Sequence, residues 1–344
     1  MLGSLEMPQS RKATPKAVIR PQEHSLQKIQ KSINGRRSGV LGPCIEAYEA
    51  HIGDEGEPVR YLNNLTYPLL AARDATKSLI RAEMTNRWRD KPDRTETAII
   101  NSLKRSAGTN FQTMTAYALA KYLEETGSAW YIQHPVPKEL KSALAIVFSG
   151  NVEIEGESTE DLVQEALEEN ADNKDAEAAS VFVVQPDVDI LIRNSEWSAA
   201  NSGREPIILL SVKTSLADRA GMAARWKTYF DQATNPCPLS GTVGCSYDKL
   251  GIKMPNADKY HIYHVIVTAN IYKLEGRDEK ARRGELNSGQ TRSNTYMFDL
   301  KLTTRDDPSA DTPSDWHQFP YIIQFLETVS TRFGLPSRAS TTLF

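Results

Sequence analysis

The chain has 344 residues, of which 40% are hydrophobic and 25% are charged. This composition is ordinary for a folded globular protein and excludes a wholly disordered chain, while the length leaves room for one large core or two smaller ones. The formal net charge of -3 argues against a surface that coats polyanions indiscriminately, but it leaves a local basic cleft open.

Apolar runs such as Ala143 to Phe148 and Ile207 to Val212 are far shorter than the ~20 residues that a membrane-spanning helix needs. The N-terminal segment is polar and basic and lacks the apolar centre of a signal peptide, so we expect a cytoplasmic protein without a membrane span. Cys44, Cys237 and Cys245 form neither a CxxC zinc motif nor a disulfide framework, so we expect three reduced thiols.

The N-terminal third of the chain is predicted to be an arm followed by helices. Residues 1–40 are rich in Ser, Pro, Gln, Lys and Arg without a sustained apolar period, which predicts a flexible basic arm that either contacts phosphates or has no role. Residues 41–92 form an expected helical portion, because apolar residues recur there at helical spacing. A further helical stretch begins after Pro92, is interrupted at Gly108 and stops at Gly127.

The strongest strand predictions are residues 180–193 and 206–213, because both segments are β-branched, apolar and bounded by turn residues. We expect these two strands to be neighbours. A helix follows the second strand, with Ser215 as its cap. The remaining expected elements are strands at residues 130–134, 260–272 and 295–303, an apolar run of ambiguous type at 143–148, and a closing helix at 321–333.

Two polar segments interrupt this pattern. Residues 151–178 are dominated by Glu, Asp and Asn and are predicted to form an exposed acidic insertion, whereas residues 276–294 are predicted to form a polar, basic loop. The mixture of strands and helices predicts an α/β fold with a central mixed sheet flanked by helices. This core is expected to span residues 93–344, with the helical N-terminal portion packed on it.

Two carboxylates open one of the strongest strands, and a lysine ends the other. Asp187 and Asp189 lie in Gln-Pro-Asp-Val-Asp-Ile-Leu-Ile, so the period of a strand places both on one face. Ser211 and Lys213 share a face in the same way at the end of Ile-Leu-Leu-Ser-Val-Lys. Neighbouring strands would therefore present these four side chains to a common point.

Such a group of side chains suits the hydrolysis of a phosphodiester. Carboxylate oxygens hold Mg²⁺, which polarises a phosphate and lowers the pKa of its bound water. A lysine beside the metal can orient or help to deprotonate that water and can neutralise charge in the transition state. One assignment stays open: Asp189 either binds the metal together with Asp187 or is a structural partner of Lys213 or Arg193.

The same residues resemble a known family. A Pro-Asp at the head of one strand, followed at the end of the next by residue-x-Lys, resembles the PD-(D/E)xK nuclease superfamily. The continuation from Lys213 to Arg219 (Lys-Thr-Ser-Leu-Ala-Asp-Arg) into a helix resembles type II restriction endonucleases in particular. The upstream segment Lys104 to Gln112 is similar to the helix that those enzymes often place before the core sheet, and the resemblance covers about Glu96 to Tyr272.

The resemblance implies a restriction-endonuclease-like core that cuts both strands of DNA at a short palindromic site with Mg²⁺. It also implies a homodimer that matches the two-fold symmetry of that site. One position departs from the family pattern, because Ser211 stands where the family usually has Asp or Glu. The Ser-x-Lys form is similar to a subset of restriction enzymes, several of which cut CCGG-type sites, in which an acidic residue from a nearby helix replaces the missing metal ligand. Candidates for that ligand are Glu96, Asp218 and Asp231.

Basic side chains in two segments are candidates for DNA contact. Arg219, Arg225 and Lys227 lie on the helix after Lys213, where they would contact phosphates or form a solvated face. Arg282 and Arg283 lie in the polar loop, which would either read guanines or simply be flexible.

Three interpretations of the chain follow from these patterns. The first is a type II restriction enzyme, and the second is a repair or junction nuclease of the same fold. The third is a DNA-binding protein without activity, in which Ser211 marks a decayed site. His261 and His264 lie on opposite faces of one strand and are interpreted as core or surface histidines rather than as a metal pair.

Overall fold

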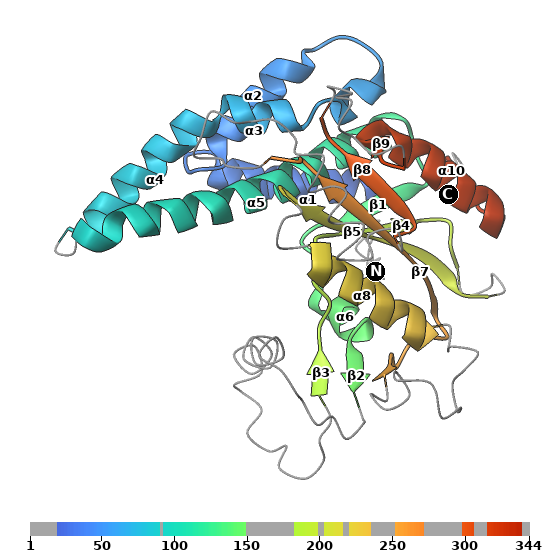
Figure 1. The fold of residues 1–344 in the computed structure, drawn as a ribbon. Helices are drawn as coiled ribbons and strands as arrows, with labels where there is room; N and C mark the ends of the chain where they lie inside the picture. The colour runs from blue at the N-terminus through green and yellow to red at the C-terminus, as the bar shows by residue number, and fades with distance from the viewer. Residues whose placement is uncertain are drawn as a thin grey trace, which may run out of the picture.

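The computed structural model describes residues 19–89, 92–148, 182–198, 203–215, 220–234, 252–271, 298–305 and 315–338. A six-stranded mixed sheet lies at the centre of these residues, with helices on both sides (Figure 1). The first three strands in the sheet order are antiparallel neighbours, and the last three continue it in parallel. In this order they are β1 (Trp130–Gln133), β4 (Ile190–Asn194), β5 (Glu205–Lys213), β7 (Tyr260–Thr268), β8 (Leu300–Thr303) and β9 (His317–Gln318).

The predicted α/β class with a central mixed sheet is therefore confirmed, as is the neighbouring position of the two strongest strands. The single strand predicted over residues 180–193 is wrong, because β3 (Phe182–Val184) and β4 belong to different sheets. Pro186 lies between them, and a residue without an N–H cannot donate to a strand ladder. β3 instead joins β2 (Ile146–Phe148) and β6 (Ile252–Lys253) in a small antiparallel sheet.

The N-terminal flexible arm is also a wrong prediction over its second half. Residues Pro21–Arg36 form helix α1, whose Ile29 and Ile33 are buried in the main core. Gln22 donates a hydrogen bond to the carbonyl of Ser128, and Ser25 donates one to that of Ile132. Two isoleucines one turn apart are a narrow apolar stripe, and tertiary packing stabilises this otherwise polar helix. Residues 1–18 of the predicted arm lie outside the described part of the chain.

The expected helical portion over residues 41–92 is confirmed in the described residues. It consists of α2 (Gly42–Ile52), the 3₁₀ helix η1 (Pro58–Leu62), α3 (Thr66–Ala71) and α4 (Arg73–Arg87). α4 packs along α5 (Pro92–Glu125), and the pair projects from the body of the molecule in Figure 1.

The predicted interruption at Gly108 does not occur, since α5 is continuous over 34 residues. A glycine inside a helix costs only about 1 kcal/mol relative to alanine. Buried neighbours on the next turn, Phe111 and Met114, anchor the helix to the main core. α5 therefore runs without a break from the projecting pair into the body of the protein.

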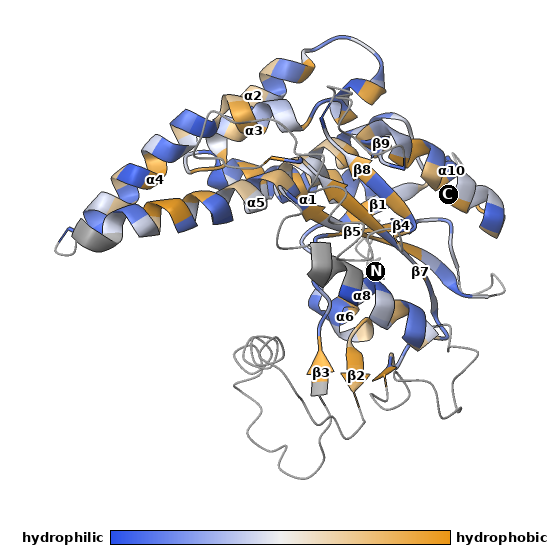
Figure 2. Cartoon of the chain, in the orientation of Figure 1, coloured by the Kyte–Doolittle hydropathy of each residue, from blue (hydrophilic) through white to orange (hydrophobic). Residues whose placement is uncertain are grey.

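Two apolar cores lie on the two faces of the sheet. The larger core joins the sheet to α1, α5 and α10 (Ile322–Phe333), which follows the short helix η4 (Phe319–Tyr321). The smaller core joins the other face to α6 (Lys138–Ala143) and α8 (Ala220–Thr234). Figure 2 shows the hydrophobic residues gathered on the strands between these layers. Among the described helices, none is long and apolar enough to cross a membrane.

Candidate active site

Lys213 lies between the two predicted carboxylates. Its Nζ donates hydrogen bonds to Asp187 Oδ2 at 2.9 Å and to Asp189 Oδ2 at 3.2 Å. The Lys213 side chain is 3% exposed and that of Asp189 is 7% exposed, whereas that of Asp187 is 43% exposed. The structure therefore brings together three of the four side chains that the sequence pattern placed at a common point, and Asp187 is the one that faces solvent.

The two carboxylates are held by the segment that leads into β4 rather than by the strand itself. Asp189 N donates to Leu210 O at 3.2 Å, which fixes this segment against β5. Val188, between the two aspartates, is buried in the smaller core. Burial of this valine turns both carboxylates toward Lys213, which is the one-face arrangement that a spacing of two residues predicts.

Asp189 is held by hydrogen bonds from three elements. Gln112 Nε2 on α5 donates to Asp189 Oδ1 at 2.6 Å, and Val212 N on β5 donates to Oδ2 at 2.6 Å. His134 Nδ1 lies 2.9 Å from the backbone oxygen of Asp189. Arg193 instead forms a bidentate pair with Glu205, so the proposed Asp189–Arg193 pair is wrong.

Burial and neighbouring charges have opposite effects on the pKa values of Asp189 and Lys213. Burial raises the pKa of Asp189 to about 6, although the charge of Lys213 acts in the other direction. Burial alone would lower the pKa of Lys213, but the charges of Asp189 and Asp187 outweigh it and raise that pKa. The lysine is therefore held as a cation, next to a carboxyl group that an additional positive charge would help to ionise.

Ser211 shares the face of Lys213 on β5 and is paired with a histidine. Its Oγ lies 2.8 Å from His264 Nε2 on the neighbouring strand β7. His264 is fully buried, and burial lowers its pKa to about 3, with the charges of Lys227 and Lys213 adding to the effect. The end of β5 thus carries a neutral Ser–His pair beside the charged Lys213.

Sequence reasoning missed Gln112, His134 and His264 as neighbours of the site. Gln112 ends the segment that resembles the helix before the sheet, so a signal for it was present. His264 was interpreted as a core or surface residue, and the structure places it in the core. Its contact with Ser211 depends on the register of β5 against β7, which pairs Leu209 with His264 and which no local pattern specifies.

Two of the three candidates for the replacement acidic ligand lie among the described residues. Neither of them contacts Asp187, Asp189 or Lys213. Glu96 is exposed and bonds Arg81 at 3.3 Å. It precedes Gln112 by more than four turns of the same continuous helix, roughly 24 Å along the axis, so its assignment to this metal site is wrong within one chain. Asp231 pairs with Lys227 at 2.5 Å. Asp218 lies outside the described residues.

The basic residues that were predicted to contact DNA differ in how the structure places them. Lys227 is 7% exposed and forms ion pairs with Asp231 and with Asp299, so its assignment as a phosphate contact is wrong. The phase of α8 turns this lysine toward the sheet rather than toward solvent. Arg225 on the same helix is partly exposed, and its role stays a prediction. Arg219, Arg282 and Arg283 lie outside the described residues, as do the predicted acidic insertion 151–178 and polar loop 276–294.

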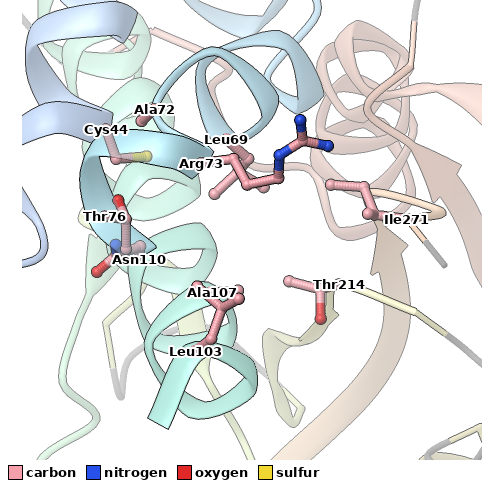
Figure 3. A pocket seen from close by; sticks show the side chains of 10 residues that line it. All are labelled: Cys44, Leu69, Ala72, Arg73, Thr76, Leu103, Ala107, Asn110, Thr214 and Ile271. Atoms are coloured by element: carbon pink, nitrogen blue, oxygen red, sulfur yellow. The ribbon is translucent and has the colours of Figure 1, made fainter. Parts of the chain in front are cut away.

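A small cavity lies between α5 and the ends of β5 and β7. Figure 3 shows Leu103 and Ala107 of α5 on one side and Thr214 and Ile271 on the other. Its volume of about 20 Å³ is enough for about one water molecule. Cys44 also lines it, and burial raises the pKa of this thiol to about 12, which makes it a poor nucleophile. The cavity is therefore too small to admit a molecule much larger than water.

A search of this sequence against known protein families finds no match, and neither does a search of the curated proteins.

Proposed function

We propose that this chain is a magnesium-dependent, site-specific endonuclease that cuts both strands of DNA, in the manner of a type II restriction enzyme. The single observation that carries the proposal is the shared lysine: Lys213 Nζ lies within 3.2 Å of carboxylate oxygens of both Asp187 and Asp189. A central mixed sheet with a helix on each face agrees with the restriction-endonuclease-like core that the resemblance implies.

The side chains present fit a magnesium ion. Mg²⁺ is usually held by one or two carboxylates together with water and substrate phosphates, rather than by a cage made only of protein ligands. No group of three or more His, Cys, Asp or Glu side chains that could hold a metal occurs among the described residues, but the two aspartates supply the usual number. Asp187 and Asp189 would hold the ion, which would polarise the scissile phosphate and lower the pKa of a bound water.

The residues of the chain would then divide the remaining work. Lys213 stays charged and would neutralise charge that develops on the phosphate, or orient the attacking water. Gln112 and the amide of Val212 hold the Asp189 carboxylate in place. The neutral Ser211–His264 pair adds no negative charge, so the site would carry one carboxylate fewer than the usual family pattern.

A second candidate function is DNA binding without cleavage. It is favoured by the extent to which Asp189 is already engaged, since both of its oxygens accept hydrogen bonds from protein donors. A carboxylate satisfied in this way can also serve as the structural partner of a buried lysine. This interpretation predicts a protein that binds DNA and leaves it intact.

The test is incubation of the purified protein with unmethylated phage DNA and Mg²⁺, with EDTA as control, followed by gel electrophoresis. Discrete bands that require the metal are the expected result. A smear would contradict site specificity and indicate a non-specific or repair nuclease. Intact DNA across several substrates and divalent metals would contradict the enzyme and favour the binding protein.

A further inference from the structure

A hollow of about 350 Å³ lies between the α1–α2 connection and α5, and its lining combines apolar surface with basic and hydroxyl side chains. Two arginines, three hydroxyl side chains and a glycine of the connection contribute to its lining. These six residues are Arg36, Ser38, Gly39, Arg105, Ser106 and Thr109. α1, α2 and α5 lie close together in this part of the molecule (Figure 1).

Among the described residues that line the hollow, two are basic and none is a carboxylate. The described hydrogen bond of Arg36 is a long one, from Nη2 to Thr113 Oγ1 at 3.4 Å, which leaves most of its five donors available to a ligand. Within the described part of the chain, neither Arg36 nor Arg105 has a carboxylate within ion-pair distance. Arg37, the neighbour of Arg36, is by contrast neutralised by Glu49 at 2.5 Å.

The wall of the hollow is built rather than incidental. Asn110 Nδ2 on α5 donates to Val40 O at 2.8 Å, which ties the connection to the helix. Gly39 N donates to Arg36 O at 3.0 Å and closes a turn at the end of α1. Both arginines therefore project from backbone whose position is fixed, a requirement for a binding site with defined geometry.

The hollow lies beside the candidate active site. Thr109, in its lining, is less than one turn of α5 away from Gln112, which bonds Asp189. Arg36 Nη2 bonds Thr113, the neighbour of Gln112 on α5, so the positive charge of α1 reaches the edge of the site.

We infer that this hollow binds a phosphate of the DNA backbone next to the phosphate that is cut, with Arg36 and Arg105 as its charged ligands. Guanidinium groups with hydroxyl and backbone N–H donors are the usual partners of a phosphodiester oxygen, and such contacts fix position without reading sequence. The inference rests on the proposed function for its ligand, but it names a site on α1 and α5 that neither the motif nor the sheet contains.

The decisive experiment measures binding without cleavage. A short fluorescent duplex of arbitrary sequence is titrated with the full-length protein in EDTA at several salt concentrations. We compare the wild type with Arg36→Gln, Arg105→Gln and the double variant. Arg20→Gln is the matched control, because Arg20 is exposed and bonds Glu124, roughly 28 Å along α5 from Arg105. Thermal unfolding checks that each variant folds. If Arg36→Gln is unstable, Arg105→Gln still tests the site, because Arg105 is exposed and its replacement should not affect folding.

The expected result is a loss of roughly tenfold in affinity for the double variant and a salt slope that is shallower by about 1, which corresponds to one lost phosphate contact. Arg20→Gln should match the wild type. Equal affinity and slope in all variants would overturn the inference, as would a wild type that binds no DNA. Inorganic phosphate that binds the wild type but not the double variant, without a change in the DNA slope, would assign the hollow to a free anion and also overturn it.

The two proposals fail separately in these experiments. Loss of DNA affinity in the double variant together with intact phage DNA under Mg²⁺ would uphold the hollow and refute the nuclease. Metal-dependent bands together with unchanged binding by the double variant would uphold the nuclease and refute the hollow.

Discussion

The two faces of β5 differ although every residue of the strand is buried. The face toward α1 and α5 carries Ile208, Leu210 and Val212, all of which belong to the larger core. The face toward α8 carries Ile207 and Leu209 at its centre, but its last two positions are Ser211 and Lys213. One strand thus supplies a purely apolar surface on one side and a polar end on the other.

The stability of the folded protein does not explain why β5 ends with polar residues on this face. Burying a lysine and a histidine costs free energy that apolar side chains of similar size would not cost, and an ion pair only partly offsets it. The chain nevertheless places a buried cation, a buried carboxylate and a neutral Ser–His pair at the end of this strand. The apolar face should therefore control stability, and the polar face should control activity.

The largest expected effect is a loss of cleavage when the exposed carboxylate of the site is removed, compared with removal of a carboxylate on α8. Asp187→Asn should reduce the rate of DNA cleavage by roughly 10³-fold, because it weakens metal binding and removes a partner of Lys213. Asp231→Asn should cleave at the wild-type rate, because Asp231 is engaged by Lys227. Initial rates on phage DNA at saturating Mg²⁺ measure both, and an equal loss in Asp231→Asn would make Asp231 the missing ligand.

The next effect compares adjacent residues on opposite faces of β5. Leu210→Ala should lower the free energy of unfolding by about 2–5 kcal/mol, because it leaves a cavity in the larger core. Ser211→Ala should lower it by about 1–3 kcal/mol, because His264 Nε2 loses its partner. Urea unfolding gives both values. At a temperature where both variants are folded, only Ser211→Ala should lose cleavage activity, and a loss in Leu210→Ala alone would contradict the division between the faces.

A pH effect should follow from the buried histidine. The folded-state pKa of His264 is about 3, below its ordinary value near 6.5, so the unfolded chain binds the proton more readily. Stability from this group is complete above about pH 6.5 and is lost as the pH falls, by about 2 kcal/mol between about pH 7.5 and pH 5.

Urea unfolding across this pH range should show the loss in the wild type and a smaller one in His264→Gln. The raised pKa of Asp189 acts in the opposite direction, since its neutral form is favoured in the folded state. Both proteins contain Asp189, so their difference isolates the histidine. Identical pH profiles would show that His264 is not buried as a neutral group.

The smallest expected effect concerns the side chain that orients Asp189. Gln112→Met keeps the size of the side chain but removes the hydrogen bond to Asp189 Oδ1, and should reduce cleavage about tenfold. Gln27→Met on the exposed face of α1 is the control, because Gln27 bonds only its helix neighbour Glu23 among the described residues. Wild-type kinetics in Gln112→Met would remove Gln112 from the account.

The sequence allowed the centre of the site to be predicted, but not its surroundings. Asp187, Asp189 and Lys213 were predicted together because two neighbouring strands were expected there, although the two aspartates lie in the segment before β4 and not in the strand itself. Glu96 was misplaced because its distance from the site depends on the packing of α5, and on this continuous helix it lies more than four turns from Gln112. The pairing of His264 with Ser211 requires the register of two strands that are far apart in sequence.

The elements of the fold also differ in whether local sequence patterns or contacts between distant segments determine them. The central strands β5 and β7 and the closing helix α10 have strong local patterns and were predicted, whereas β4 was predicted only as part of one longer strand. Helix α1 was not, because its two buried isoleucines are a weak signal among polar residues. The small sheet was not predicted either, since it joins β2, β3 and β6 from three distant segments.

The most direct test of the central claim compares two buried lysines of the same sheet. Lys213 pairs with Asp187 and Asp189 on β5, whereas Lys301 pairs with Asp315 on β8. Lys213→Met and Lys301→Met are assayed for Mg²⁺-dependent cleavage of phage DNA, with binding in EDTA and thermal unfolding as controls. We expect Lys213→Met to bind DNA without cutting it, and folded Lys301→Met to cut at the wild-type rate. Cleavage by folded Lys213→Met at the wild-type rate would contradict the central claim.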